Sequence, residues 1–211
     1  MRKRSLIPAI AIFMTAALQA QGQPPVSIAQ RLDTPQARVI VATLQPHLPV
    51  NARAGHATDR VLIYLDEGAM TVKDGDTAST RIEFRRGDVR WRAASGPYVA
   101  ENLSDQPIRI LEIDLKSAIS SPAPTTKLDP VAVDPQHYKV AFENERVRVL
   151  RVHYEAREKG ATHEHILNRI VLYVNDQPNA KADDVRVAGA ATHAEENASD
   201  SPADRIAVEL K

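Results

Sequence analysis

The segment RIVLYVND at residues 169–176 repeats, position by position, the segment RVLIYLDE at residues 60–67. Two further matches follow in the same order along the chain: NLSDQP at 102–107 with NASDSP at 197–202, and IDLK at 113–116 with VELK at 208–211. Three matched blocks in one order indicate an internal duplication. We therefore interpret the chain as two copies of one domain.

Both copies consist of short segments rich in β-branched and apolar residues, which is the pattern of β-strands. The segments span 38–44, 61–65, 69–72, 80–84, 89–91 and 108–114 in the first copy, and 146–154, 170–174, 185–187 and 205–210 in the second. No window shows a long helical period. Many short strands at this spacing predict an all-β sandwich or barrel for each copy.

The sequence divides into five parts. We expect a signal peptide at 1–20, an N-terminal segment at 21–36, a first domain at 37–116, a linker at 117–135 and a second domain at 136–211. The linker is rich in Pro, Ser and Thr, and its prolines block regular hydrogen-bonded structure. The segment 21–36 carries little signal, and at most one helical turn is expected over Ile28–Leu32.

The first twenty residues have the features of a secretory signal. Three cations, Arg2 to Arg4, precede an apolar run at 6–18, and Leu18–Ala20 is a plausible cleavage site. An uncleaved anchor is the alternative, but a polar stretch follows and the run is short for a membrane span. We expect an exported protein, periplasmic or secreted, without a stable membrane span after cleavage.

The overall composition narrows the class of partner. The 211 residues include 27 basic and 27 acidic side chains, and no basic run would follow a phosphate backbone, so nucleic acid is not an expected partner. The chain has no cysteine, which excludes disulfides, thiolate ligands and a lipid-modified cysteine. The fold must rely on core burial instead.

The second copy is shorter than the first in one place. From Glu67 to Asn102 is 35 positions, whereas from Asp176 to Asn197 is 21, so 14 residues are missing where the first copy has its hairpin around Gly75. A barrel that lacks two strands should have an open sheet edge. The other copy or a second molecule would cover it, so a homo-oligomer is one expectation.

Three histidines of the second copy have the spacing of a metal site. His163 and His165 alternate on a predicted strand and therefore share a face, from which Glu164 should point away, and His193 follows 28 residues after His165. Each alone would be an ordinary surface or core histidine. Together they predict a divalent transition-metal site (Fe, Zn, Ni, Mn or Cu). Neutral imidazole suits Zn, Fe, Ni and Cu, whereas hard ions such as Mg or Ca prefer oxygen ligands.

In this order and spacing, His163-Glu164-His165 and His193 followed by Asn197 resemble the two motifs of the cupin superfamily. The resemblance spans both copies, as in a bicupin, and implies two tandem double-stranded β-helix barrels of jelly-roll type. The acid of the first motif is absent, with Asn168 and Arg169 at the expected positions. A three-histidine site is similar to the iron centres of thiol dioxygenases.

Residues around His193 could complete the site. Glu195 or Glu196 could face the cavity and replace the missing carboxylate, although acids near a hairpin are usually solvated. Asn197 could orient His193, but Asn102 matches it in a copy without the triad, which favours a structural role in a turn.

The first copy retains little of the metal site. Aligning the repeats sets His56 opposite His165 and Tyr98 opposite His193, but Ala54 opposite His163. One imidazole and one phenol do not make a divalent metal site. We interpret this copy as a scaffold, or as an apolar pocket with Tyr98 at its mouth.

Two functions from different classes fit these observations. The first is a metal-dependent oxygenase or isomerase that acts on a small molecule at His163, His165 and His193; no further acid or base is identifiable from the sequence. The second is a non-catalytic cupin module of the cell envelope that binds a small ligand or is structural. Whether the protein is an enzyme stays open at this point.

Overall fold

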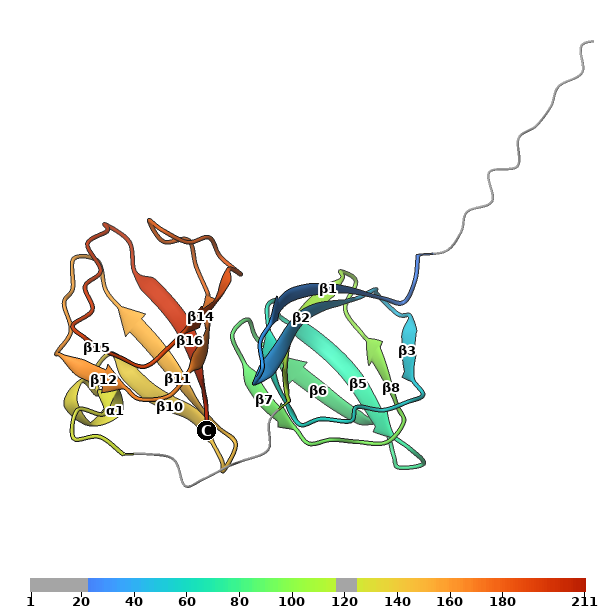
Figure 1. Ribbon diagram of the computed structural model, residues 1–211. Helices are drawn as coiled ribbons and strands as arrows, with labels where there is room; N and C mark the ends of the chain where they lie inside the picture. Colours follow the sequence, from blue (N-terminus) through green and yellow to red (C-terminus); the bar gives the residue numbers. More distant parts are fainter. Residues whose placement is uncertain (1–22, 117–124) are drawn as a thin grey trace, which may run out of the picture.

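The computed structural model describes residues 23–116 and 125–211. The expected signal peptide and the first part of the expected linker, residues 117–124, lie outside the described residues. The described chain forms two β-barrels that lie side by side (Figure 1). All named strand pairings are antiparallel, which confirms the predicted all-β class.

The first barrel is closed by two sheets. The larger sheet has the order β1 (Val26–Asp33), β2 (Ala37–Leu44), β9 (Ile108–Leu115), β4 (Arg60–Tyr64) and β7 (Val89–Arg92). The smaller sheet has the order β3 (Pro49–Ala52), β8 (Tyr98–Asn102), β5 (Gly68–Asp74) and β6 (Thr80–Phe84).

The second barrel repeats this arrangement with fewer strands. Its larger sheet has the order β10 (Tyr138–Glu143), β11 (Val147–Tyr154), β16 (Ala203–Leu210), β13 (Arg169–Tyr173) and β14 (Val185–Ala188). Its smaller sheet contains β12 (His163–His165) and β15 (Ala191–His193). Strands β5 and β6 have no counterpart, so the 14-residue difference corresponds to two strands and leaves β15 at a sheet edge.

Strand registers show the duplication at the level of single residues. Arg60 lies opposite Asp114 in the first barrel, and Arg169 lies opposite Glu209 in the second. The Asn102 amide donates to the Gln106 carbonyl at 2.8 Å, and the Asn197 amide donates to the Ser201 carbonyl at the same distance. Both asparagines therefore hold the same turn in their own barrel.

The helical turn expected over Ile28–Leu32 is wrong, because strand β1 occupies this region and pairs with β2. A β-bulge between Gln30 and Leu32 shifts the register, and strand β10 carries the same irregularity between Val140 and Phe142. We expected residues 26–33 to belong to a separate N-terminal segment. In the structure they form an edge strand of the first barrel instead.

The two large sheets pack against each other and share one hydrophobic core. Side chains alternate along each strand, so one face lines the barrel interior and the other faces the neighbouring barrel. The shared core contains residues of both barrels, among them Val39, Val61, Leu111 and Ile113 of the first and Val149, Ile170, Leu172 and Val208 of the second. Its burial joins the barrels into one packing unit.

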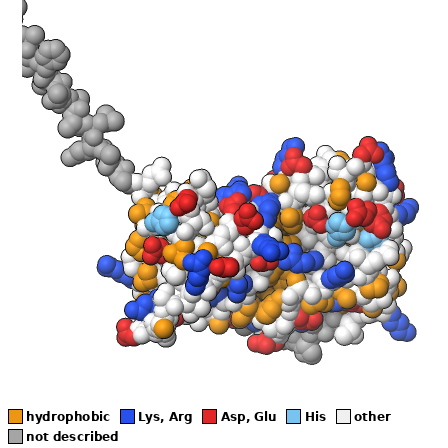
Figure 2. All heavy atoms as spheres, turned by 180° about the vertical axis from the view of Figure 1, so that it is seen from behind, with side chains coloured by type: hydrophobic (Ala, Val, Ile, Leu, Met, Phe, Trp, Pro, Cys, Tyr) orange, Lys and Arg blue, Asp and Glu red, His pale blue; other side chains and the backbone are white. Residues whose placement is uncertain are grey.

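Polar contacts surround this shared core. The Arg109 guanidinium of the first barrel donates to Asp183 of the second at 2.7 Å, and Arg146 of the second barrel pairs with Asp59 of the first at 2.8 Å. Figure 2 shows basic and acidic side chains interspersed over one face of the molecule.

The described end of the expected linker lies against the second barrel. A short helix, α1 (Pro130–Val133), begins after Asp129, whose carboxylate accepts from two backbone N–H groups of its first turn. The Glu164 backbone N–H donates to the Leu128 carbonyl at 2.8 Å, which holds this segment beside β12. The part of the chain that the structure describes has no helix with the length and apolarity of a membrane span.

Candidate metal centre

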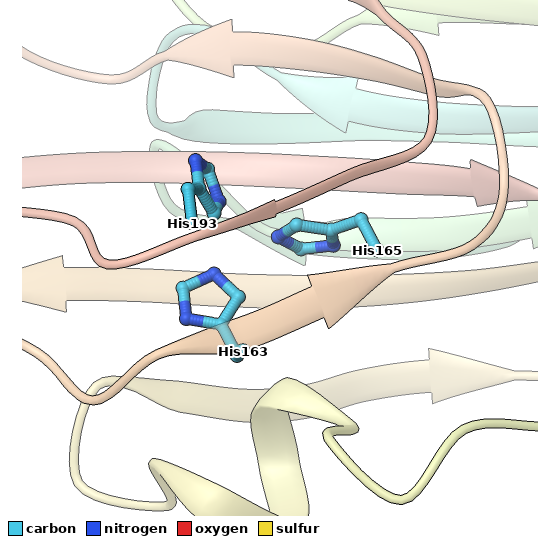
Figure 3. Close-up of side chains that lie close together, drawn as sticks. All are labelled: His163, His165 and His193. Atoms are coloured by element: carbon cyan, nitrogen blue, oxygen red, sulfur yellow. The ribbon is translucent and has the colours of Figure 1, made fainter.

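The structure brings the three predicted histidines of the second barrel together. His163 lies directly opposite His193 in the β12 and β15 pair, and His165 follows His163 on the same face of β12. One ring nitrogen of each residue lies within 4.8 Å of those of the other two. Figure 3 shows the three rings gathered around one point. His163 and His165 are almost fully buried.

Hydrogen bonds fix two of the three imidazoles. The Nδ1 of His163 donates to the Ala161 carbonyl at 2.9 Å, and the Nδ1 of His165 donates to Glu209 Oε1 at 2.9 Å. In the neutral ring this puts the lone pair on each Nε2, which lies 3.1 Å from the Tyr138 hydroxyl in His163. The Nε2 of His193 is buried without a hydrogen-bond partner among the described residues. The three imidazoles thus offer nitrogen lone pairs that can bind a metal ion.

Burial keeps the rings of His163 and His193 neutral. It lowers the pKa of His193 to about 4, with repulsion from the neighbouring imidazoles as the next cause, and it also lowers the pKa of His163. Neutral imidazole is the form that binds a metal ion. The donors therefore stay available below the pH at which an exposed histidine is protonated.

The donor set fits a borderline transition metal. Three imidazole nitrogens suit Fe, Zn, Ni or Cu and leave a coordination position open. Glu164 points away from the triad, as expected, since its carboxylate accepts a hydrogen bond from the Thr126 hydroxyl. The described cluster contains no carboxylate ligand, only His163, His165 and His193.

A carboxylate that the sequence reading missed lies behind the triad. Glu209 on β16 is 4% exposed and accepts the hydrogen bond from His165. Arg148 lies 3.9 Å from its other oxygen, and Arg169 is its cross-strand neighbour. A carboxylate behind a ligating histidine fixes the ring and raises its basicity. The repeat gave one sign of this residue. It aligns VELK with IDLK, so both copies have an acid at this position, Glu209 in the second and Asp114 in the first.

The three residues proposed to complete the site have different positions. Glu195 faces the interior, where it accepts from the Tyr138 hydroxyl at 2.9 Å and forms an ion pair with Arg205. Glu196 pairs instead with Lys159 at 3.4 Å, and its side chain is 54% exposed. The amide of Asn197 donates to turn carbonyls. Glu195 lines the cavity beside the triad, but none of the three residues belongs to the cluster of possible ligands.

Tyr138 is a second residue that the sequence reading missed. Its hydroxyl lies 3.1 Å from the Nε2 of His163 and 2.9 Å from Glu195. The hydroxyl has one proton and two acceptors, so it can donate to only one of them at a time. Burial raises the pKa of Tyr138 and keeps that proton in place at neutral pH.

A cavity of about 150 Å³ adjoins the triad. Its lining includes His165, His193, Glu195 and the two arginines Arg169 and Arg205. Burial lowers the pKa of both guanidiniums. A cavity of this size has room for a small molecule only, and its arginines favour an anionic one.

The corresponding site of the first barrel has a different composition. His56 and Tyr98 lie together as the alignment predicts, with 2.9 Å between Nε2 and the hydroxyl. Glu112 and Asp114 lie close to His56, but Arg60 contacts Glu112 at 3.3 Å and Arg38 contacts Asp114 at 2.7 Å. Arginines thus neutralise the carboxylates that a metal would need.

Comparison with known proteins identifies the architecture. No protein family matches the sequence, and no curated protein is similar to it in sequence. Solved structures do match across both barrels. AerE from Microcystis aeruginosa is 10% identical with a TM-score of 0.65, over 90% of this chain and 95% of its own.

Two further solved structures are similar over most of their length. A cupin 2 conserved barrel domain protein from Leptotrichia buccalis is 13% identical with a TM-score of 0.56, over 88% of this chain and 89% of its own. A variant of the oxalate decarboxylase of Bacillus subtilis is 12% identical with a TM-score of 0.59, over 87% and 75%. At such low identity the likeness concerns the fold, which is that of a two-barrel cupin.

Proposed function

We propose that the second barrel of this two-barrel cupin fold contains the active site of a metalloenzyme. The enzyme would be an oxygenase or an isomerase that acts on a small organic anion. His163, His165 and His193 would hold the ion. The observation that carries this proposal is the convergence of three imidazoles beside a cavity lined by two arginines. A divalent ion there would act as a Lewis acid with at least one open coordination position.

The charges around the cavity favour an anionic substrate. Glu195 and Glu209 formally cancel Arg169 and Arg205, and burial keeps His163 and His193 neutral. A divalent ion would therefore add two positive charges to a buried site, where uncompensated charge is costly. A small carboxylate of the substrate would balance this charge and could also pair with a guanidinium.

Tyr138 and Glu195 supply a proton carrier beside the triad. The Tyr138 hydroxyl can donate to Glu195, and both groups lie at the edge of the space between the histidines and the arginines. The Glu195 carboxylate can accept a proton from the substrate, while the Tyr138 hydroxyl keeps its own proton and donates a hydrogen bond to this carboxylate. Glu195 is thus a candidate base that the sequence alone does not identify, with Tyr138 as the residue that positions it.

Anion binding by the metal-loaded protein tests the proposal. Mn(II) is a suitable ion, since the oxalate decarboxylase of Bacillus subtilis has Mn(II) centres, and oxalate is a dianion small enough for the cavity. We expect oxalate to change the Mn(II) electron paramagnetic resonance spectrum, and Arg205→Gln to weaken this effect about 10-fold, the cost of a lost charge-assisted hydrogen bond.

Arg81→Gln is the matched control, because Arg81 is an exposed arginine of the first barrel paired with Glu83. It should bind oxalate as the wild type does. Equal loss in both variants, or no response to oxalate by loaded wild type, would contradict the assignment of the substrate class. Oxygen uptake with a panel of small acids then distinguishes an oxygenase from an isomerase.

Failure to load Fe, Zn, Ni, Mn or Cu would contradict the metal centre itself. That outcome would favour the alternative, a non-catalytic protein of the cell envelope that binds a small ligand or is structural.

We also propose that the protein is exported, on the strength of the basic, apolar and small-residue order of its first twenty residues. Cell fractionation with N-terminal sequencing tests this. A mature protein outside the cytoplasm that begins after Ala20 is expected, and a full-length cytoplasmic chain would contradict export.

A further inference from the structure

The first barrel contains a cavity of about 640 Å³, which lies apart from the metal centre. This volume is typical of sites for small organic ligands. Most of the wall is apolar and comes from both sheets: Ile40, Leu44, Leu62, Met70, Val72 and Ile110 are examples.

One wall of the cavity is strongly basic. Arg60 on β4 and Arg92 on β7 are cross-strand partners, and Arg90 is the next residue of β7 on the same face. All three line the cavity. The Arg92 guanidinium also lies over the ring of Tyr98, 4.4 Å from its centroid. Three cations thus occupy one side of an otherwise apolar space.

The nearby acidic side chains do not fully compensate the positive charge of this wall. Glu112 is the one acid that lines the cavity, and it contacts Arg60 at 3.3 Å. Asp74 pairs with Arg92 from the protein surface, while Arg90 donates to a backbone carbonyl. Burial lowers the pKa of His56 to about 4, so this ring is neutral. The wall carries more positive than negative charge.

Arg60 provides an independent observation that points to a ligand. Its side chain is 2% exposed, and its Nε is buried without a hydrogen-bond partner in the described structure. The Nε of Arg92 is likewise buried without a hydrogen-bond partner among the described residues. Buried guanidinium N–H groups without acceptors are costly, and a carboxylate can satisfy several of them at once.

We infer that the first barrel binds a small organic anion with an apolar body, whose carboxylate pairs with Arg60 and Arg92 while its body fills the apolar part of the cavity. The exposed side chain of Ile28, which belongs to the lining, extends the apolar surface to the edge strand β1. A neutral apolar molecule would leave the arginines unpaired, and a small polar anion would leave the apolar wall uncovered.

Calorimetric titration tests this inference directly, since the ring of Trp91, the one tryptophan of the chain, lies on the other face of β7 and stacks on Phe142 of the second barrel. We expect decanoate to give a saturable binding heat, and decanol, which has the same chain without the charge, to bind about 10-fold more weakly or worse. A saturable response that is equal for both compounds, or no saturable response, would overturn the inference.

Two substitutions with opposite expected effects separate binding from misfolding. Arg60→Gln should weaken decanoate binding about 10-fold or more, because a charged partner is lost. Glu112→Gln should strengthen it, because the acid that competes for Arg60 loses its charge. A loss in both variants, or no change in Arg60→Gln, would contradict the proposed contact.

The double variant His163→Ala and His165→Ala shows which of the two barrels binds decanoate. It removes two triad residues from the second barrel and should bind decanoate as the wild type does. Loss of decanoate binding in this variant would assign the ligand to the metal centre and overturn the site in the first barrel.

Discussion

Glu209 connects the candidate metal centre to the sheet of the second barrel, because it accepts the Nδ1 hydrogen of His165 while it is buried between arginines. Glu209→Gln keeps the shape of the side chain but removes the charge that orients the ring. We expect metal affinity to fall about 10- to 100-fold, the usual effect of such partners. Metal titration followed by elemental analysis measures this change.

Asp204→Asn is the control for this prediction, since Asp204 lies on the same strand with its side chain 42% exposed and paired with His153. Its metal affinity should match that of the wild type. An unchanged affinity in Glu209→Gln would show that the contact with His165 does not contribute to metal binding.

Three histidines with lowered pKa values, one buried and two partly buried, make the stability of the metal-free protein depend on pH. Burial lowers the pKa of His56 and His193 to about 4 and also lowers that of His163, whereas in the unfolded chain these rings titrate near 6.5. Below 6.5 the unfolded chain binds more protons, so stability should fall as the pH decreases from 6.5 towards 4. Thermal unfolding across this range measures the slope.

The variant His193→Gln should show a shallower slope than the wild type, because one ring that titrates differently in the folded and unfolded states is absent. Identical slopes would contradict the assignment of a lowered pKa to His193.

At the scale of elements, the turn before β12 determines where His163 lies. A Cβ atom on Gly160 would lie 2.3 Å from the Tyr154 hydroxyl and 2.4 Å from an oxygen of Asp134. Gly160→Ala should therefore cost about 1–3 kcal/mol in the free energy of unfolding, as overpacking does. Chemical denaturation measures this cost.

Gly96→Ala offers a matched comparison, because a Cβ atom there would contact nothing within 4 Å. Its effect should stay within about 0.5 kcal/mol. Equal effects of both substitutions would contradict the close approach at Gly160.

Strands β12, β1 and β16 show which features of the site and the fold could be predicted from the sequence and which could not. Alternation on a strand was enough to place His163 and His165 on one face, and the resemblance of His193 and Asn197 to the second cupin motif placed His193 near them. Strand β1 was missed because most of its residues are exposed, so it lacks a clear apolar alternation. Glu209 was missed because its contact with His165 spans 44 residues and depends on which strands pair.

At the scale of the whole molecule, the shared core predicts that the barrels unfold together. Ile113 of the first barrel and Ile170 of the second are buried in this same cluster. Ile113→Ala and Ile170→Ala should each lower the free energy of unfolding by about 2–5 kcal/mol, in one transition common to both barrels. Calorimetry with separate transitions for the two barrels would contradict a shared core.

The metal content of the purified protein tests the central claim most directly. Elemental analysis should be made on the wild type and on the double variant His163→Ala and His165→Ala, each before and after reconstitution with Fe(II), Mn(II) and Zn(II). We expect close to one ion per wild-type chain and almost none in the variant. Wild-type protein that stays free of metal after reconstitution, or a variant that retains it, would contradict a metal centre at His163, His165 and His193.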